Sequence, residues 1–163
     1  IREYDDQIQT LVKRHADYKL FAALPCGDNS RARLIAALGD DRNRYTTADE
    51  LAAASGIAPL TIQSGKKRHV CSRWACTKFM KQTFHEFAGL SILKSPWARA
   101  YYGLQIAKGK SAQMAKRALA FKWIRILYRC WKDGTHYDED HYVRRLVDTK
   151  SPLAKKLAPA SAT

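Results

Sequence analysis

The chain has 163 residues, of which 46% are hydrophobic and 10% aromatic, so it can bury one core, and a chain disordered throughout is excluded. Its formal net charge of +14 makes a polyanion such as nucleic acid the expected partner. It opens on Ile1 without a signal-peptide pattern and has no apolar run long enough to cross a bilayer. We therefore expect a fragment of a soluble cytoplasmic protein with no membrane partner.

The positive charge is concentrated in the middle of the chain. Residues 61–132 hold sixteen Lys and Arg against one acidic residue, Glu86. Residues 1–60 hold eight basic and nine acidic residues, and residues 133–163 hold five of each. The middle block is therefore the part expected to contact a polyanion.

The first segment has apolar residues at alternating spacings of three and four. This pattern predicts a coiled-coil-like helix over residues 1–22 and a homo-oligomer formed through it. The same stripe is typical of an amphipathic helix that packs on its own core, and the pattern leaves both interpretations open. The stripe consists of Ile1, Tyr4, Ile8, Leu11, His15, Tyr18 and Ala22.

Residues 23–56 are predicted to form a helix-hairpin-helix. Pro25 and Gly27 end the first helix, and Asn29 or Ser30 is expected to cap the second. Free backbone N–H groups at such a turn can hold a phosphate, which makes Gly27 a candidate contact. An ordinary helical hairpin fits the spacing equally well.

A third helix is expected to begin at a capping box formed by Thr47 and Glu50 and to end at Gly56. Residues 57–72 then form a segment in which Leu60, Thr61 and Ile62 favour extended backbone. Gln63 to Arg68 is polar and contains glycine, so it is predicted to be a loop. Ser64 is therefore expected on an exposed connection.

Residues 73–148 are predicted to form a basic helical bundle, which makes the fold class mainly α. Long helices are expected over 73–93, from the Ser95 cap to Gly109, and from the Ser111 cap to Gly134, with a short helix after Asp138. Residues 149–163 are rich in Pro, Ala, Ser and Lys and are predicted to be a flexible tail. The expected core aromatics are Phe79, Trp97, Trp123 and Trp131.

Basic residues are better candidates for phosphate contacts than these core aromatics. Glycine beside them lets the backbone approach a phosphate closely. The candidate nucleic-acid-binding residues are Gly27, Gly65, Lys66, Lys67, Arg68, Arg73, Lys78, Lys116, Arg117 and Arg125.

The four cysteines are scattered, and only Cys71 and Cys76 lie close together. With His69 and His85 nearby, a zinc site is conceivable, but no C-x-x-C or H-x-x-x-H pair is present. Reduced structural cysteines are the default interpretation, and no metal ligand is assigned.

Four segments carry a resemblance to a known family. The run LPCGDNSRARLIAALG resembles the helix-hairpin-helix segment that opens the C-terminal domain of insertion sequence 110 family transposases, the group that includes the Piv DNA invertase. SGIAPLTIQSGKK, WARAYY and RALAFKWIRILYRCWKDGTHYDE are similar to that family's next segments in the same order. The resemblance covers about residues 20–150. It departs at the hairpin, where the usual Pro-Gly-x-Gly reads Pro25-Cys26-Gly27-Asp28 and is one residue shorter.

The resemblance implies one half of a two-part enzyme. Family members have an N-terminal RuvC-like domain with an acidic metal site and a C-terminal domain with a nucleophilic serine, joined through a coiled coil. This chain resembles the second part and the end of the coiled coil, so no cofactor is expected within it, and Mg²⁺ is implied for the full-length enzyme. By motif, the family serine falls on Ser64, which would attack a DNA phosphodiester and hold the broken strand as a phosphoserine link.

The same resemblance implies partners and a location. DNA is the substrate, and a structured guide RNA that pairs with donor and target DNA is the implied partner. A bacterial, nucleoid-associated place in the cytoplasm follows from that role.

A serine hydroxyl is a weak nucleophile and needs a base, a metal or charge stabilisation at phosphorus. The cations Lys66, Lys67, Arg68 and Arg73 are candidates for charge stabilisation. His85 with Glu86, or His69, are candidate bases, although surface or packing roles are more common for such residues. Carboxylates for a metal are almost absent between Leu51 and Lys132, so the metal must come from elsewhere.

Two functions remain open on the sequence. The first is the serine-nucleophile part of a recombinase, with Ser72 as a rival to Ser64. The second is a helix-hairpin-helix module that binds nucleic acid without chemistry, in which Ser64 is an ordinary turn residue.

Overall fold

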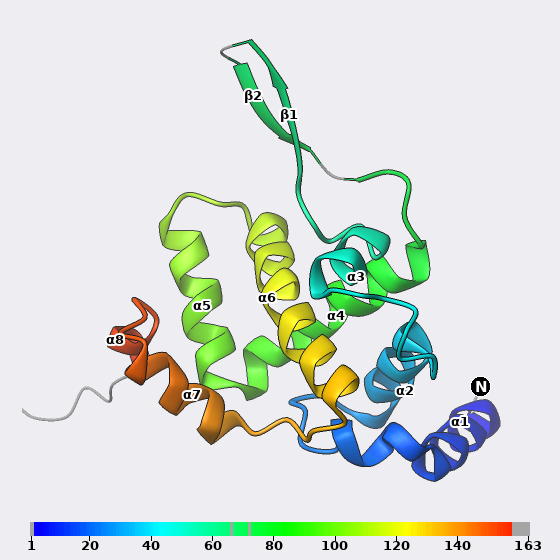
Figure 1. Ribbon diagram of the computed structural model, residues 1–163. Helices are drawn as coiled ribbons and strands as arrows, with labels where there is room; N and C mark the ends of the chain where they lie inside the picture. Colours follow the sequence, from blue (N-terminus) through cyan, green and yellow to red (C-terminus); the bar gives the residue numbers. More distant parts are fainter. Residues whose placement is uncertain (1, 66, 72, 158–163) are drawn as a thin grey trace, which may run out of the picture.

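The computed structural model describes residues 2–65, 67–71 and 73–157 and is mainly helical, as predicted (Figure 1). A two-stranded antiparallel hairpin interrupts the run of helices. The elements are α1 (Arg2–Arg14), a 3-10 helix η1 (Ala16–Phe21), α2 (Asp28–Leu38), α3 (Ala48–Ala54), β1 (Leu60–Ser64), β2 (Lys67–Cys71), α4 (Lys78–Lys94), α5 (Pro96–Ala107), α6 (Ala112–Asp133), α7 (Glu139–Asp148) and α8 (Ala154–Leu157).

The longest helix, α6, is the centre of the core and contacts α3, α4 and α5. Its residue Trp123 is fully buried and donates through Nε1 to Ser91 Oγ of α4 at 2.8 Å. Trp97 of α5 is also fully buried and donates through Nε1 to the Tyr137 hydroxyl at 2.8 Å. Because each buried N–H has an acceptor, these large rings fill the core without an unpaired polar group.

Three of the four aromatic residues expected in the core are there, since Trp97, Trp123 and Trp131 are 0% exposed. The prediction is wrong for Phe79, which is 43% exposed. Phe79 lies in the first turn of α4, beyond the core contacts, and the guanidinium of Arg33 stacks on its ring at 5.6 Å. The Phe79 ring is therefore covered by Arg33 and not by the core.

Most of the predicted helix caps are confirmed. The hydroxyls of Thr47, Ser95 and Ser111 and the Asp138 carboxylate each accept an N–H of the following first turn. At the third helix, the Glu50 carboxylate reaches back to the N–H of Thr46, one residue before the cap. The caps therefore satisfy first-turn donors that would otherwise be unpaired.

The predicted start of the fourth helix at Arg73 is wrong, because α4 begins at Lys78. The residues before it are held in a bend, and the Thr77 N–H donates to Ala54 O at 3.3 Å. This tertiary hydrogen bond keeps residues 73–77 out of α4, although the sequence pattern alone favours a helix there.

The predicted single helix over residues 1–22 is wrong beyond Arg14. His15 has extended backbone, and its Nδ1 accepts the N–H of Asp17, which caps η1 in place of a continued α-helix. Residues 149–157 also differ from the expected flexible tail, and the rest of that prediction, residues 158–163, lies outside the described residues. Leu153 is buried at 3% exposure, and α8 packs against α5 and α7. Ala154 and Leu157 also pack against the core, so apolar burial holds this part of the chain on the body.

No helix in the described ranges is long and apolar enough to span a membrane.

Candidate functional site

The segment around Ser64 forms a β-hairpin where a polar loop was expected over Gln63 to Arg68. Strands β1 and β2 pair in register from Leu60 with Cys71 to Ser64 with Lys67. Gly65 follows Ser64 with φ 55°, a conformation that suits a tight two-residue connection. The extended backbone predicted at Leu60 to Ile62 is confirmed, and pairing with β2 carries it on through Ser64.

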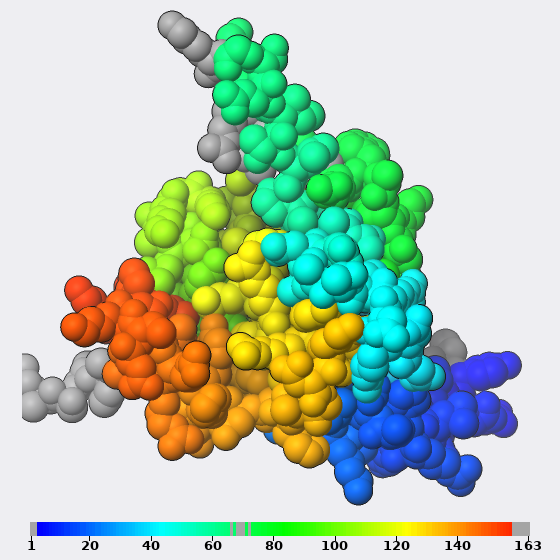
Figure 2. All heavy atoms as spheres, in the orientation of Figure 1, coloured from blue at the N-terminus to red at the C-terminus, as the bar shows by residue number. Residues whose placement is uncertain are grey.

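Ser64 lies at the far end of the hairpin, which projects from the helical body (Figure 1 and Figure 2). Its side chain is exposed, and so is that of Lys67. Directly opposed residues of an antiparallel pair face the same side of the sheet, so Lys67 is placed beside Ser64. The arrangement presents a hydroxyl and a cation together, clear of the core.

Ser64 Oγ has no hydrogen-bonding partner among the described residues. Glu86, a candidate base, instead forms an ion pair with Arg33 and accepts from Gln82 Nε2 at 2.7 Å. Burial lowers the pKa of His85, and a hydrogen bond with the Gln113 backbone opposes that effect. His85 therefore faces the start of α6, and neither it nor Glu86 is oriented to serve Ser64.

Four further candidates near Ser64 fall where no side chain is described. His69 pairs with Ile62 through the backbone, but its side chain lies outside the described residues, as does that of Arg68. Lys66 and the rival nucleophile Ser72 also lie outside them.

The base of the hairpin is fixed to the helical body at Gly56. This glycine has φ 68°, and a Cβ built on it would lie 2.4 Å from Cys76 Sγ, so the chain before β1 touches the chain after β2. Lys81 Nζ donates to Arg73 O at 3.3 Å in the same region. Only glycine allows this approach, because any side chain would overlap Cys76.

Arg73 and Lys78 lie at this base and not at the tip. Four residue steps along a strand span about 13 Å, so the base lies about that far from Ser64 along the hairpin. Arg73 is half-buried, Lys78 is exposed as the first residue of α4, and the neighbouring Trp74 is 96% exposed. The hairpin therefore separates two of the candidate phosphate contacts from the candidate nucleophile.

Gly27 caps α2, which begins at Asp28 and not after the predicted Asn29 or Ser30 caps. The buried Arg31 crosses this start and donates to Phe21 O at 2.8 Å, to Ala22 O at 3.1 Å and to the Asp28 carboxylate. An acid already occupies the first turn, where a helix N-terminus favours negative charge. The Asp28 carboxylate is therefore already paired with Arg31, and this helical turn lies in the helical body below the β-hairpin (Figure 1).

The remaining candidates lie on α6. Lys116 and Arg117 are half-buried in its first turns, and Arg125 is exposed further along. Arg125 pairs with Asp49 at 3.2 Å and stacks on Phe121 at 4.9 Å. The predicted site residues are thus spread over the hairpin, the start of α2 and α6.

The described residues do not offer a fitting magnesium site. Their single group of three potential ligands is His15, Asp17 and Asp40. Nδ1 of His15 caps η1, and Nε2 of the same ring forms a hydrogen bond with the Asp40 carboxylate at 2.9 Å. Asp17 forms an ion pair with Arg42. Mg²⁺ prefers several free oxygen ligands, and these donors are already engaged.

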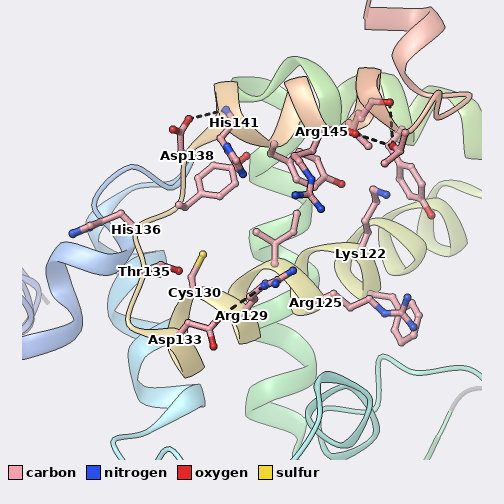
Figure 3. A pocket seen from close by; sticks show the side chains of 17 residues that line it. Lys122, Arg125, Arg129, Cys130, Asp133, Thr135, His136, Asp138, His141 and Arg145 are labelled. Carbon is pink, nitrogen blue, oxygen red and sulfur yellow. Dashed lines mark hydrogen bonds and ion pairs between the residues drawn. The ribbon is translucent and has the colours of Figure 1, made fainter.

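Of the predicted nucleic-acid-binding residues, Arg125 lines a groove of about 1090 Å³ between α6 and α7 (Figure 3). Its walls include Lys122 and Arg125 of α6, Arg145 of α7 and the rings of Tyr101 and Tyr142. The positive charge of α6 is visible in the sequence, but nothing local indicates that α5 and α7 bring tyrosines to Lys122.

The chain belongs to the IS116/IS110/IS902 transposase family, whose model matches residues 20–103. It is 30% identical over 133 residues to the "Mini-circle putative transposase for IS117" of Streptomyces coelicolor, covering 81% of this chain and 32% of that protein. An IS110 insertion element protein of the same organism is 30% identical over 84% of this chain and 34% of its own length. An IS900 protein of Mycobacterium paratuberculosis is 27% identical over 84% of this chain and 35% of its own length. The chain spans about a third of the length of these relatives.

Proposed function

We propose that this chain is the nucleic-acid-binding and serine-nucleophile part of a transposase that cuts and rejoins DNA during insertion-sequence transposition. Membership of the transposase family and a net charge of +14 support a DNA substrate. The observation that carries the proposal is the position of Ser64, exposed beside Lys67 at the end of a projecting hairpin. A nucleophile in that position can reach a phosphodiester of bound DNA without moving the helical body.

The proposed reaction is a phosphoryl transfer to serine. Ser64 Oγ gives up its proton as it forms a bond to phosphorus, and the bond from phosphorus to one strand oxygen breaks. That oxygen takes up one proton and leaves as a hydroxyl, so the total number of protons is unchanged. Lys67 stabilises negative charge on the non-bridging oxygens. The resulting phosphoserine link keeps the energy of the broken bond for rejoining to another strand.

The chemistry requires groups from outside the described residues. No base contacts Ser64 there, and the His15, Asp17 and Asp40 group is engaged in structural bonds. We propose that carboxylates of another domain of the full-length protein would hold Mg²⁺, which would supply charge neutralisation at the phosphate. This chain would supply the hydroxyl, the neighbouring cation and the DNA-binding surface.

The proposed partners are DNA, a structured guide RNA and a second copy of the chain. Self-association through residues 1–22 is supported by α1, on which Tyr4, Ile8 and Leu11 are 72%, 43% and 66% exposed. These three residues share one face at coiled-coil spacing. A partner helix would cover apolar area that this chain leaves in water.

A second candidate function is binding without chemistry. It is favoured by the absence of a base beside Ser64 in the described residues, since a structural turn serine needs none. The two functions differ in whether Ser64 becomes attached to DNA.

The test uses the full-length protein and a suicide DNA substrate, nicked so that the cut strand is lost and the attached strand accumulates. We expect wild type and Ser72→Ala to give a protein–DNA adduct on a denaturing gel. Ser64→Ala should give none and still bind DNA with near-normal affinity, because it changes no charge. Charge reversals at Lys66, Lys67 and Arg73 should weaken binding and reaction together. An adduct from Ser64→Ala would refute the assignment, and no adduct from wild type would favour the binding module.

A further inference from the structure

The groove between α6 and α7 contains a cation without an anion. The ammonium of Lys122 lies 5.3 Å from the centre of the Tyr101 ring and 5.9 Å from that of Tyr142. Burial, and then the charge of Arg125, lower the pKa of Lys122. Across the described ranges, no carboxylate or carbonyl oxygen hydrogen-bonds to it. Two rings stabilise the charge in part, and its hydrogen-bond donors remain open to a ligand.

A second cation faces the same space from the other helix. Arg145 of α7 is exposed, and its guanidinium pairs with no acid in the part of the chain that the structure describes. Lys122 of α6 and Arg145 of α7 both extend into the groove from its two walls (Figure 3). Two donors on opposite walls are suited to one anion held between them.

The acidic residues of the groove lie toward its other end. Asp133 pairs with Arg129 at 3.6 Å, and Asp138 caps α7 by accepting from His141 N at 2.9 Å (Figure 3). Both acids are therefore engaged locally. The end of the groove at Lys122 keeps its positive charge.

The lining matches a nucleotide strand better than a simple anion. Beside the cations, Tyr101, Phe121 and Tyr142 leave part of their rings exposed, and aromatic rings next to cations are the usual platform for unpaired bases. Bases of a duplex are already stacked and would not use such rings. A volume of about 1090 Å³ is close to the upper end of small-ligand sites, about 300–1,000 Å³, so it suits a few nucleotides.

We propose that this groove binds a short unpaired stretch of nucleic acid, with a phosphodiester between Lys122 and Arg145 and a base against the neighbouring rings. The proposal rests on the proposed nucleic-acid function and adds a strand-binding site on the helical body, apart from the hairpin. It assigns the groove to unpaired strands, while the general positive charge attracts paired and unpaired nucleic acid alike.

The test compares two double variants with the same loss of charge. Lys122→Gln with Arg145→Gln changes the groove. Lys108→Gln with Arg144→Gln is the matched control, because both residues are exposed and neither lines the groove. Fluorescence anisotropy of the 163-residue chain would be measured with labelled oligothymidine, oligouridine and a duplex of equal length, after urea unfolding shows that both variants are folded.

We expect the groove variant to bind both single strands about tenfold or more weakly, and the control less than about threefold. Duplex affinity should fall equally in both variants. Lys122→Arg should keep single-strand affinity, because it keeps the charge and the donors. Equal losses on single strands in the two double variants would overturn the groove and leave the proposed function intact. Failure of wild type to bind any of the three probes would instead overturn the proposed function itself.

Discussion

Replacement of Gly56 by alanine tests how the hairpin is held on the helical body. Gly56 has φ 68°, and alanine in this left-handed region costs about 1–2 kcal/mol. The new Cβ would lie 2.4 Å from Cys76 Sγ and 2.7 Å from Cys76 Cβ, closer than real Cβ contacts. Relieving such an overlap by moving the backbone costs about 1–3 kcal/mol more. Gly56→Ala should therefore lower the free energy of unfolding by about 2–5 kcal/mol.

Gly134→Ala is the matched control, because Gly134 also has a positive φ of 65° and no atom within 4 Å of a built Cβ. It should cost only the conformational part, about 1–2 kcal/mol. Urea titrations of the two variants, with equal m-values, give the difference directly. Hydrogen exchange of the Thr77 N–H, which donates to Ala54 O at the hairpin base, should also be faster in Gly56→Ala alone. Equal unfolding midpoints for the two variants would refute the close contact with Cys76.

Three further predictions test the core, the pH dependence and the surface charge. Tyr137→Phe should lower the free energy of unfolding by about 1–3 kcal/mol, because it leaves the buried Trp97 Nε1–H without its acceptor. Tyr102→Phe should change this free energy little, and equal effects of the two variants in thermal melts would contradict the prediction. Since burial holds the pKa of His85 below its ordinary value of 6.5, His85 contributes stability that is present above about pH 6.5 and is lost as the pH falls toward the lowered pKa. His85→Gln should therefore lose less stability than wild type between about pH 7.5 and about pH 5 in urea titrations, and an unchanged loss would show that other groups cause it. Binding of the chain to a labelled oligonucleotide should weaken steeply as salt rises, and an affinity that hardly changes would exclude a mainly electrostatic interface.

Local signals in the sequence were sufficient for much of the helical framework. Thr47, Ser95, Ser111 and Asp138 cap the helices that their positions indicated, because a cap depends on groups within three or four residues. Gly134 ends α6 with a left-handed backbone for the same reason. These features need no knowledge of the rest of the fold.

The failures come from hydrogen bonds that the spacing of residues alone does not reveal. The bend before α4 is held by a bond from Thr77 to Ala54, and η1 replaces a helical turn because His15 accepts from Asp17. A pattern of spacings cannot show which of two local hydrogen-bonding arrangements the packing will favour. Gln63 to Arg68 were expected as a loop because this run is polar and contains glycine, and the pairing of β1 with β2 became visible only with the register.

The same limit applies to the candidate site. Ser64 was singled out by its family motif and by the adjacent glycine, and its place opposite Lys67 follows from strand pairing. The groove at Lys122 joins side chains of α5, α6 and α7, separated by tens of residues in the sequence. The number of Lys and Arg residues in the sequence indicates that α6 is basic. It does not indicate that Tyr101 and Tyr142 lie next to Lys122.

The most direct test of the serine assignment is to locate the DNA attachment point. The adduct formed by the full-length protein on the suicide substrate would be digested with a protease and a nuclease, and the modified peptide would be sequenced by mass spectrometry. We expect a phosphate or nucleotide remnant on Ser64, in a peptide that contains Ile62, Gln63 and Ser64. A remnant on Ser72 or on a residue outside this chain would contradict it.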